Sequence, residues 1–190
     1  MNARPPRTLQ AFSILELLLV ITILGVLSVV SWKVIVNDLQ RARLNAVSQD
    51  FVDWVEGIRK AALRTQGGCQ ITVVNLTNAS SGTQLASVQN LDTSDPPCAA
   101  STTFVYRAAT SSGKLSSAAT NLVFTFTPRG TILGATSNTA LPADVEVRLA
   151  LQGISQLRCL RLSGLLGSSQ IGSNGTTGNV GSICTSYGKF

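Results

Sequence analysis

The sequence predicts an α+β fold in which one long N-terminal helix packs on an antiparallel β-sheet. Two observations carry this prediction. An uncharged run from Leu17 to Val30 is followed by apolar residues at three- and four-residue spacing, the pattern of a helix with one buried face. After Gly67, short segments alternate between apolar and polar residues, as half-buried strands do.

The helix is expected at 12–66, followed by a β domain at 67–190. About 20 apolar residues span a bilayer as a helix, so a transmembrane segment is expected at about 12–32. The second half carries the apolar stripe, and Gln66-Gly67-Gly68 is a stop signal. The stripe consists of Val47, Phe51, Trp54, Val55, Ile58 and Ala62. Phe51 and Trp54 are expected to be core residues and not a ligand site.

An ordinary secretory signal peptide, cleaved near Val29-Val30-Ser31, is the alternative interpretation of the apolar run. Glu16 at the leading edge of the run argues against it, because such apolar regions tolerate a carboxylate poorly. The helical pattern also continues beyond Trp32, where a mature domain would begin.

The strand prediction rests on β-branched and alternating segments, and Thr127-Pro128-Arg129-Gly130 predicts a type I turn. The segment 76–100 is rich in polar residues and predicts a long loop. The tail from Gly164 is rich in Gly and Ser and predicts disorder unless Cys184 holds it. Strands are expected at Cys69–Val74, Thr103–Ala108, Leu122–Phe126, Thr131–Leu133, Asp144–Leu151 and Leu157–Leu162.

The four cysteines, Cys69, Cys98, Cys159 and Cys184, are widely spaced and none lies in a CxxC pair. This pattern favours two disulfides in an oxidising compartment. Three connectivities are possible. Pairing Cys69 with Cys98 and Cys159 with Cys184 is favoured, because each bond closes a loop of moderate length, worth roughly 3 kcal/mol. Free buried thiols are the alternative.

The composition excludes several kinds of chemistry. The chain has no His, which removes Ser-His and Cys-His nucleophile pairs and a favoured zinc ligand. A net charge of +6 is mild for a nucleic-acid-binding protein. Asn90, Asp92 and Asp95 loosely resemble a calcium cluster, but their spacing is not that of a ligand loop, so a solvated loop is favoured. No catalytic residues, cofactor or metal are expected.

The segment Ala11-Phe12-Ser13-Ile14-Leu15-Glu16, with the apolar run behind it, carries a family resemblance. A short leader containing Arg4 and Arg7 precedes it. The arrangement resembles the prepilin processing site of type IV pilins and type II secretion pseudopilins, where a small residue, usually Gly, precedes Phe, Thr, Leu, any residue and Glu. Ala11 in place of Gly, and Ser13-Ile14 in place of Thr-Leu, are departures. The resemblance covers about the first thirty residues.

This resemblance implies that residues 1–11 are a leader, removed by prepilin peptidase between Ala11 and Phe12, with methylation of the new Phe12 amine. It implies a pilin-like fold and a single-pass protein of the bacterial inner membrane, whose β domain is periplasmic and later part of an extracellular filament. Glu16 would be an assembly contact with the Phe12 amine of a neighbouring subunit; alternatively, it lies unpaired among lipid headgroups. The implied partners are other pilin or pseudopilin subunits, prepilin peptidase, the inner-membrane assembly platform and membrane lipid.

A second, shorter resemblance concerns Leu122–Gly130 and the strands at Asp144–Leu151 and Gln156–Leu162. It is to the GspH/FimT subgroup of minor pilins and pseudopilins. The expected function is therefore a minor structural subunit of a type IV pilus or a type II secretion pseudopilus.

Some FimT-like pilins bind DNA through a Gly-Arg-x-Arg stretch, and a DNA-binding minor pilin for DNA uptake is the alternative function. The matching place here, Gly164-Leu165-Leu166-Gly167, has neither Arg. Arg158 and Arg161 lie nearby, but their odd spacing puts them on opposite faces of a strand. Nucleic acid is therefore not expected as a partner.

Overall fold

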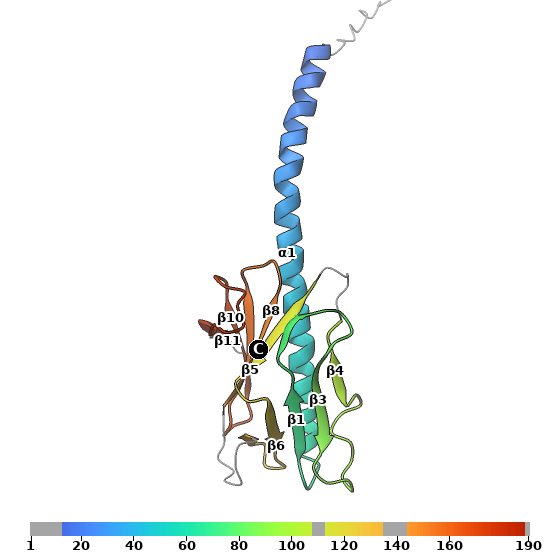
Figure 1. The fold of residues 1–190 in the computed structure, drawn as a ribbon, viewed down its shortest axis with the longest axis vertical. Coiled ribbons are helices and arrows are strands. Elements are labelled where there is room, and N and C mark those ends of the chain that lie inside the picture. Colours follow the sequence, from blue (N-terminus) through green and yellow to red (C-terminus); the bar gives the residue numbers. More distant parts are fainter. Residues whose placement is uncertain (1–12, 108–112, 135–143, 189–190) are drawn as a thin grey trace, which may run out of the picture. The chain divides into compact units, whose positions relative to one another are not determined.

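The computed structural model describes residues 13–107, 113–134 and 144–188, without the side chains of residues 27–34. The chain divides into two compact units, Met1–Asp38 and Leu39–Phe190. Helix α1 (Ile14–Ala62) runs through both (Figure 1). All the strands that the structure describes belong to the second unit, to which α1 contributes its residues from Leu39 onwards.

Local hydrogen bonds explain where α1 begins and ends. Ser13 precedes the helix, and its Oγ accepts a hydrogen bond from the backbone N–H of Leu15 at 3.3 Å, as an N-cap does. At the other end, the N–H of Arg64 bonds to the carbonyl of Ala61 at 2.8 Å, a three-residue spacing that tightens the last turn. The helix therefore ends at Ala62, earlier than the glycine pair alone predicts.

Two antiparallel sheets make up the β structure. The first has the strand order β4-β3-β1-β6-β7 and the second β11-β10-β9-β8-β5-β2. The first consists of β1 (Cys69–Val73), β3 (Gln84–Asn90), β4 (Thr103–Val105), β6 (Val123–Phe126) and β7 (Ile132–Gly134). The second consists of β2 (Leu76–Ala79), β5 (Leu115–Ala119), β8 (Val145–Leu151), β9 (Leu157–Leu162), β10 (Ser169–Asn174) and β11 (Ser186–Gly188).

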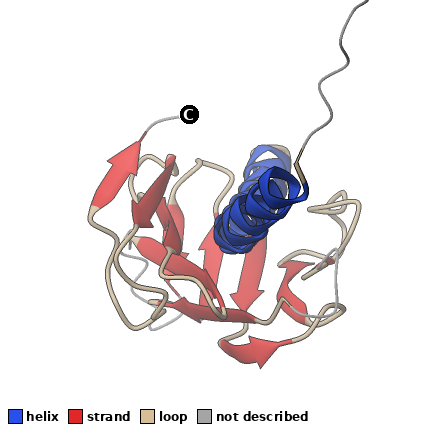
Figure 2. Ribbon diagram, turned by 90° about the horizontal axis from the view of Figure 1, so that it is seen from above, coloured by secondary structure: helices blue, strands red, loops and turns tan. Residues whose placement is uncertain are grey.

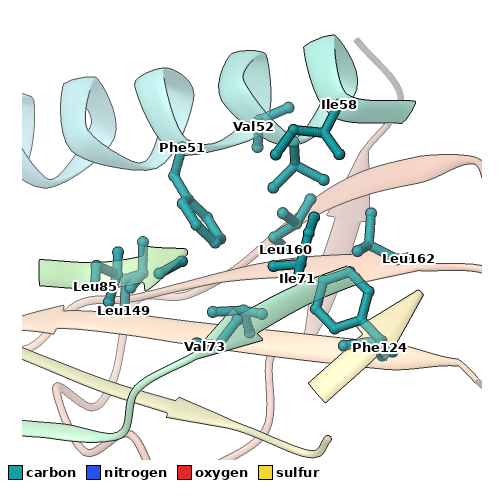
Figure 3. Close-up of a cluster of buried hydrophobic side chains, with 14 of the residues drawn as sticks. Phe51, Val52, Ile58, Ile71, Val73, Leu85, Phe124, Leu149, Leu160 and Leu162 are labelled. Carbon is teal, nitrogen blue, oxygen red and sulfur yellow. The ribbon is translucent and has the colours of Figure 1, made fainter. Parts of the chain in front are cut away.

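The core of the second unit lies where α1 meets both sheets. In Figure 3 the side chains of Phe51 and Ile58 point from α1 toward those of the strands. The first sheet supplies Ile71 and Phe124, and the second supplies Leu160, so one continuous cluster joins all three layers. Figure 2 shows the strands gathered along one side of the helix. This confirms the predicted stripe as a core face.

Two disulfides crosslink the second unit. Cys69 on β1 bonds to Cys98, and Cys159 on β9 bonds to Cys184, with Cα–Cα distances of 5.8 Å and 6.2 Å. This is the connectivity that the loop lengths favour. The second bond lies on the face of its sheet away from α1, in a small cluster with Ala150 and Leu157.

The predicted fold class is wrong. The sequence predicts a pilin-like helix, half in a membrane and half amphipathic, on one antiparallel sheet, whereas the structure has two antiparallel sheets. The second sheet was not predicted because four of its strands, β2, β5, β10 and β11, consist mainly of small and polar residues, so their apolar alternation is weak. The predicted long loop at 76–100 contains β2 and β3. The tail from Gly164, expected to be disordered unless Cys184 holds it, is held by the Cys159–Cys184 bond and contains β10 and β11.

The predicted placement as a single-pass protein of the bacterial inner membrane, with its transmembrane segment at about 12–32, is also corrected. Among the residues that the structure describes, no helix is both long and apolar enough to cross a membrane. A span needs about 20 apolar residues.

Candidate assembly site

The predicted cleavage and methylation site, Ala11 and Phe12, lies outside the described residues. The structure does describe the helical segment that follows, Ile14–Val26, here called the arm. It belongs to the first unit of the chain.

Apolar side chains of the arm are exposed on every side of the helix. Ile14 is 84% exposed, Leu15 79% and Val26 69%, and all the large apolar residues between them are also exposed. The hydroxyl of Thr22 bonds to the carbonyl of Leu19 at 2.8 Å, so the helix itself satisfies this polar group. A contiguous apolar surface of this kind marks an interaction site, because monomeric soluble proteins rarely leave one uncovered.

Glu16 is the one ionisable residue between Ser13 and Val26, and it lies exposed in the first turn of α1. A carboxylate is stabilised there by the positive end of the helix dipole. Ser13 and Glu16 also have the spacing of a capping box, S-x-x-E. Sequence reasoning missed this helix-start role of Ser13, although the spacing signals it.

Phe51 and Trp54 were predicted to be core residues. Phe51 is fully buried, which confirms that prediction. Trp54 is half-buried and stacks with Phe51 at a ring distance of 6.1 Å, while its indole N–H donates to the carbonyl of Ser101 at 3.2 Å. Trp54 therefore reaches the surface of the domain.

Asn90, Asp92 and Asp95 have local structural partners. The carboxylate of Asp95 accepts hydrogen bonds from the backbone N–H groups of Gln66 and Gly67 at 2.8 Å, so it closes the turn that follows α1. Asn90 donates to the carbonyl of Pro96 at 2.8 Å. Asp92 accepts bonds from Ser94, and these hold its pKa below the ordinary range. Within the described ranges, no group of three or more potential metal ligands comes together.

Arg158 and Arg161 point in different directions, as their spacing on β9 predicts. Arg158 donates to Asn45 of α1 at 2.7 Å, and burial lowers its pKa. Arg161 lies on the other face, 3.1 Å from Asp144 and 5.7 Å from the ring centroid of Tyr187. The pair does not form the clustered cations that DNA binding requires. We therefore do not propose the DNA-uptake alternative.

Comparisons with protein-family models, with curated proteins and with solved structures found no match to this chain.

Proposed function

We propose that this chain is a minor pilin or pseudopilin, a structural subunit of a type IV pilus or of a type II secretion pseudopilus. Prepilin peptidase cleaves it between Ala11 and Phe12, and it then assembles through the arm. The observation that carries the proposal is the exposed apolar arm with its single carboxylate, directly behind the segment that resembles a prepilin processing site. The work of the protein is structural and not catalytic.

The physics of assembly follows from the arm's surface. Fully burying a Leu or Ile side chain stabilises by about 1.5–3 kcal/mol, so packing the arm among the arms of other subunits supplies a strong, non-directional attraction. Such packing does not by itself fix how far one helix slides along another. A charged pair inside the apolar bundle fixes the axial position of one helix relative to the next. Sliding away from that position would leave both charges buried and unpaired, which is costly.

Glu16 is the residue whose charge fixes this axial position. After cleavage, the new amine of Phe12 on a neighbouring subunit is the matching positive charge. The place of Glu16 in the first turn of α1 is compatible with this contact, since a carboxylate accepts several hydrogen bonds at once.

The test is the variant Glu16→Gln, which keeps the size of the side chain and removes its charge. We expect normal cleavage and an incorporation into filaments at least about tenfold lower, because a hydrogen bond to a charged group contributes about 1.5–3 kcal/mol. Incorporation is measured as the amount of the chain that co-purifies with sheared filaments. Thr22→Ala, on the same arm, is the control and should incorporate normally. Normal incorporation of Glu16→Gln would contradict the pairing.

A further inference from the structure

One face of α1 in the second unit is left uncovered by the strands. Figure 2 shows the strands gathered along one side of the helix. On another side Gly57 is exposed, and a Cβ built there would meet nothing within 4 Å. At about 100° per residue, four exposed charged residues lie within about 60° of Gly57 around the helix. They are Asp50, Asp53, Lys60 and, in the turn just after the helix, Arg64; together with Gly57 they are here called the charged face.

The charged face carries one sign of charge at each end. Asp50 and Asp53 precede Gly57, and Lys60 and Arg64 follow it. The order is nearly symmetrical about the glycine, because Asp50 and Arg64 each lie seven residues from it. Among the residues that the structure describes, none of the four charged side chains has an ion-pair partner.

Other charges close to this face do not neutralise it. Arg59 forms an ion pair with Glu56 at 3.1 Å, and Glu56 also accepts a hydrogen bond from Ser169 at 2.6 Å. Arg107 lines a groove beside β4 together with Asp50 but makes no ion pair with it. The four charges of the face are therefore available to a partner with the opposite order of charge.

We propose that the charged face pairs with the same face of a second copy of this chain, with the two α1 helices antiparallel and crossing at Gly57. A two-fold axis at the crossing sets Asp50 of each copy opposite Arg64 of the other. The same axis sets Asp53 opposite Lys60. Antiparallel copies match both ends of the face at once, whereas parallel copies match at most one end, so the charges favour a closed dimer. The inference goes beyond the proposed function, because no residue of the arm takes part.

The residues of the face suit different parts of this contact. A glycine at the crossing lets two backbones approach closely, because it has no side chain to separate them. Exposed ion pairs add little affinity, but they select the partner and its orientation. The face extends about 21 Å from Asp50 to Arg64 at 1.5 Å per residue, so the contact is of the small, transient class. We expect a weak dimer that forms at high protein concentration and dissociates in salt.

The orientation is tested by thiol crosslinking of the purified full chain, in a mild detergent that covers the arm. Gly57→Cys places two thiols beside the two-fold axis, so a crosslinker of short reach should join two copies at this position. Ala46→Cys, also exposed on this side of α1, is the matched control. In the antiparallel dimer the two copies of position 46 lie about 33 Å apart along the helix, and they should not be joined.

The charges are tested in the Gly57→Cys background. Asp50→Lys with Asp53→Lys makes the face wholly positive, and Lys60→Glu with Arg64→Glu makes it wholly negative. Each double variant alone should lower the crosslink yield at least about fivefold, because like charges then face each other. An equimolar mixture of the two should restore the yield, and so should the quadruple variant, in which the order of charge is reversed. Salt at about 1 M should lower the yield of the unreversed face.

Three results overturn the proposal. One is the absence of a link at position 57 in the chain with its native charges, even at high protein concentration. Another is a link at position 46 as strong as that at position 57, which indicates parallel helices. The third is a yield at position 57 that the charge reversals leave unchanged. Recovery in the mixture shows that neither double variant lost its links by misfolding. The proposed function is judged separately, by cleavage and by incorporation into filaments.

Discussion

At the scale of single residues, Asp144 shows how the fold fixes a charge. Its carboxylate accepts a hydrogen bond from the backbone N–H of Gly164 at 2.9 Å and another from Arg161 at 3.1 Å. These contacts, the backbone bond first, lower the pKa of Asp144 from its ordinary value of 3.8. They also tie the start of β8 to the beginning of the turn between β9 and β10, residues 163–168.

The lowered pKa makes stability depend on pH. Because the folded protein holds Asp144 ionised more readily than the unfolded chain does, the stabilisation is fully present above the ordinary pKa. It is lost as the pH falls through the lowered folded value. We expect Asp144→Asn to lower the urea midpoint near neutral pH, with the difference from wild type shrinking between about pH 5 and pH 2. Asp53→Asn, an exposed carboxylate on α1, is the control; a difference for Asp144→Asn that persists at the lowest pH would contradict this account.

Residue roles were predictable from sequence where they depend on periodicity. Phe51 falls on the apolar stripe and is fully buried. The role of Asp95 could not be found in this way, because its partners Gln66 and Gly67 are 29 and 28 residues away and are brought close only by the fold. Trp54 follows the stripe, yet it lies at the edge of the core, where it also lines a groove beside β4.

At the scale of elements, the tail after β9 is ordered by pairing and by a covalent bond. Strand β10 pairs with β9 from Ser169 to Asn174, and Cys184 bonds to Cys159. The ring of Tyr187 covers Gly172, where a Cβ would lie 2.6 Å from it. The sequence suggests disorder here because so few residues are apolar. The disulfide compensates for the small area that the tail can bury.

Removing this disulfide should loosen the tail selectively. For the double variant Cys159→Ser and Cys184→Ser, we expect a loss of about 3–4 kcal/mol in the free energy of unfolding, from the chain entropy of the closed loop. Limited proteolysis should then cut first between residues 164 and 188. The matched variant Cys69→Ser and Cys98→Ser should expose the segment after β3 instead. Equal protection of the tail with and without the Cys159–Cys184 bond would show that strand pairing alone orders it.

The elements that the sequence predicted correctly are those with strong apolar alternation. Strands β8 and β9 appear within a residue of the expected bounds, and β6 and β7 flank the predicted turn, which is closed by a bond from Gly130 N–H to the Thr127 carbonyl at 2.9 Å. Strands β2, β5, β10 and β11 have little apolar alternation. Their positions depend on backbone pairing with neighbours, which no local pattern encodes.

At the scale of the whole molecule, three features of the surface remain exposed. The first unit presents the arm; the second presents Leu165 and Leu166 in the turn at residues 163–168 and a groove between α1 and β4. In the proposed function, the arm becomes buried when subunits meet. In the proposed function, cleavage between Ala11 and Phe12 is the step that precedes assembly through the arm.

The central claim is that cleavage at the processing motif precedes assembly. It is tested most directly by mass spectrometry of the N-terminus of the chain recovered from sheared filaments. We predict a chain that begins at Phe12, with the added mass of a methyl group on its amine. A recovered chain that begins at Met1 or at Trp32 would contradict the account.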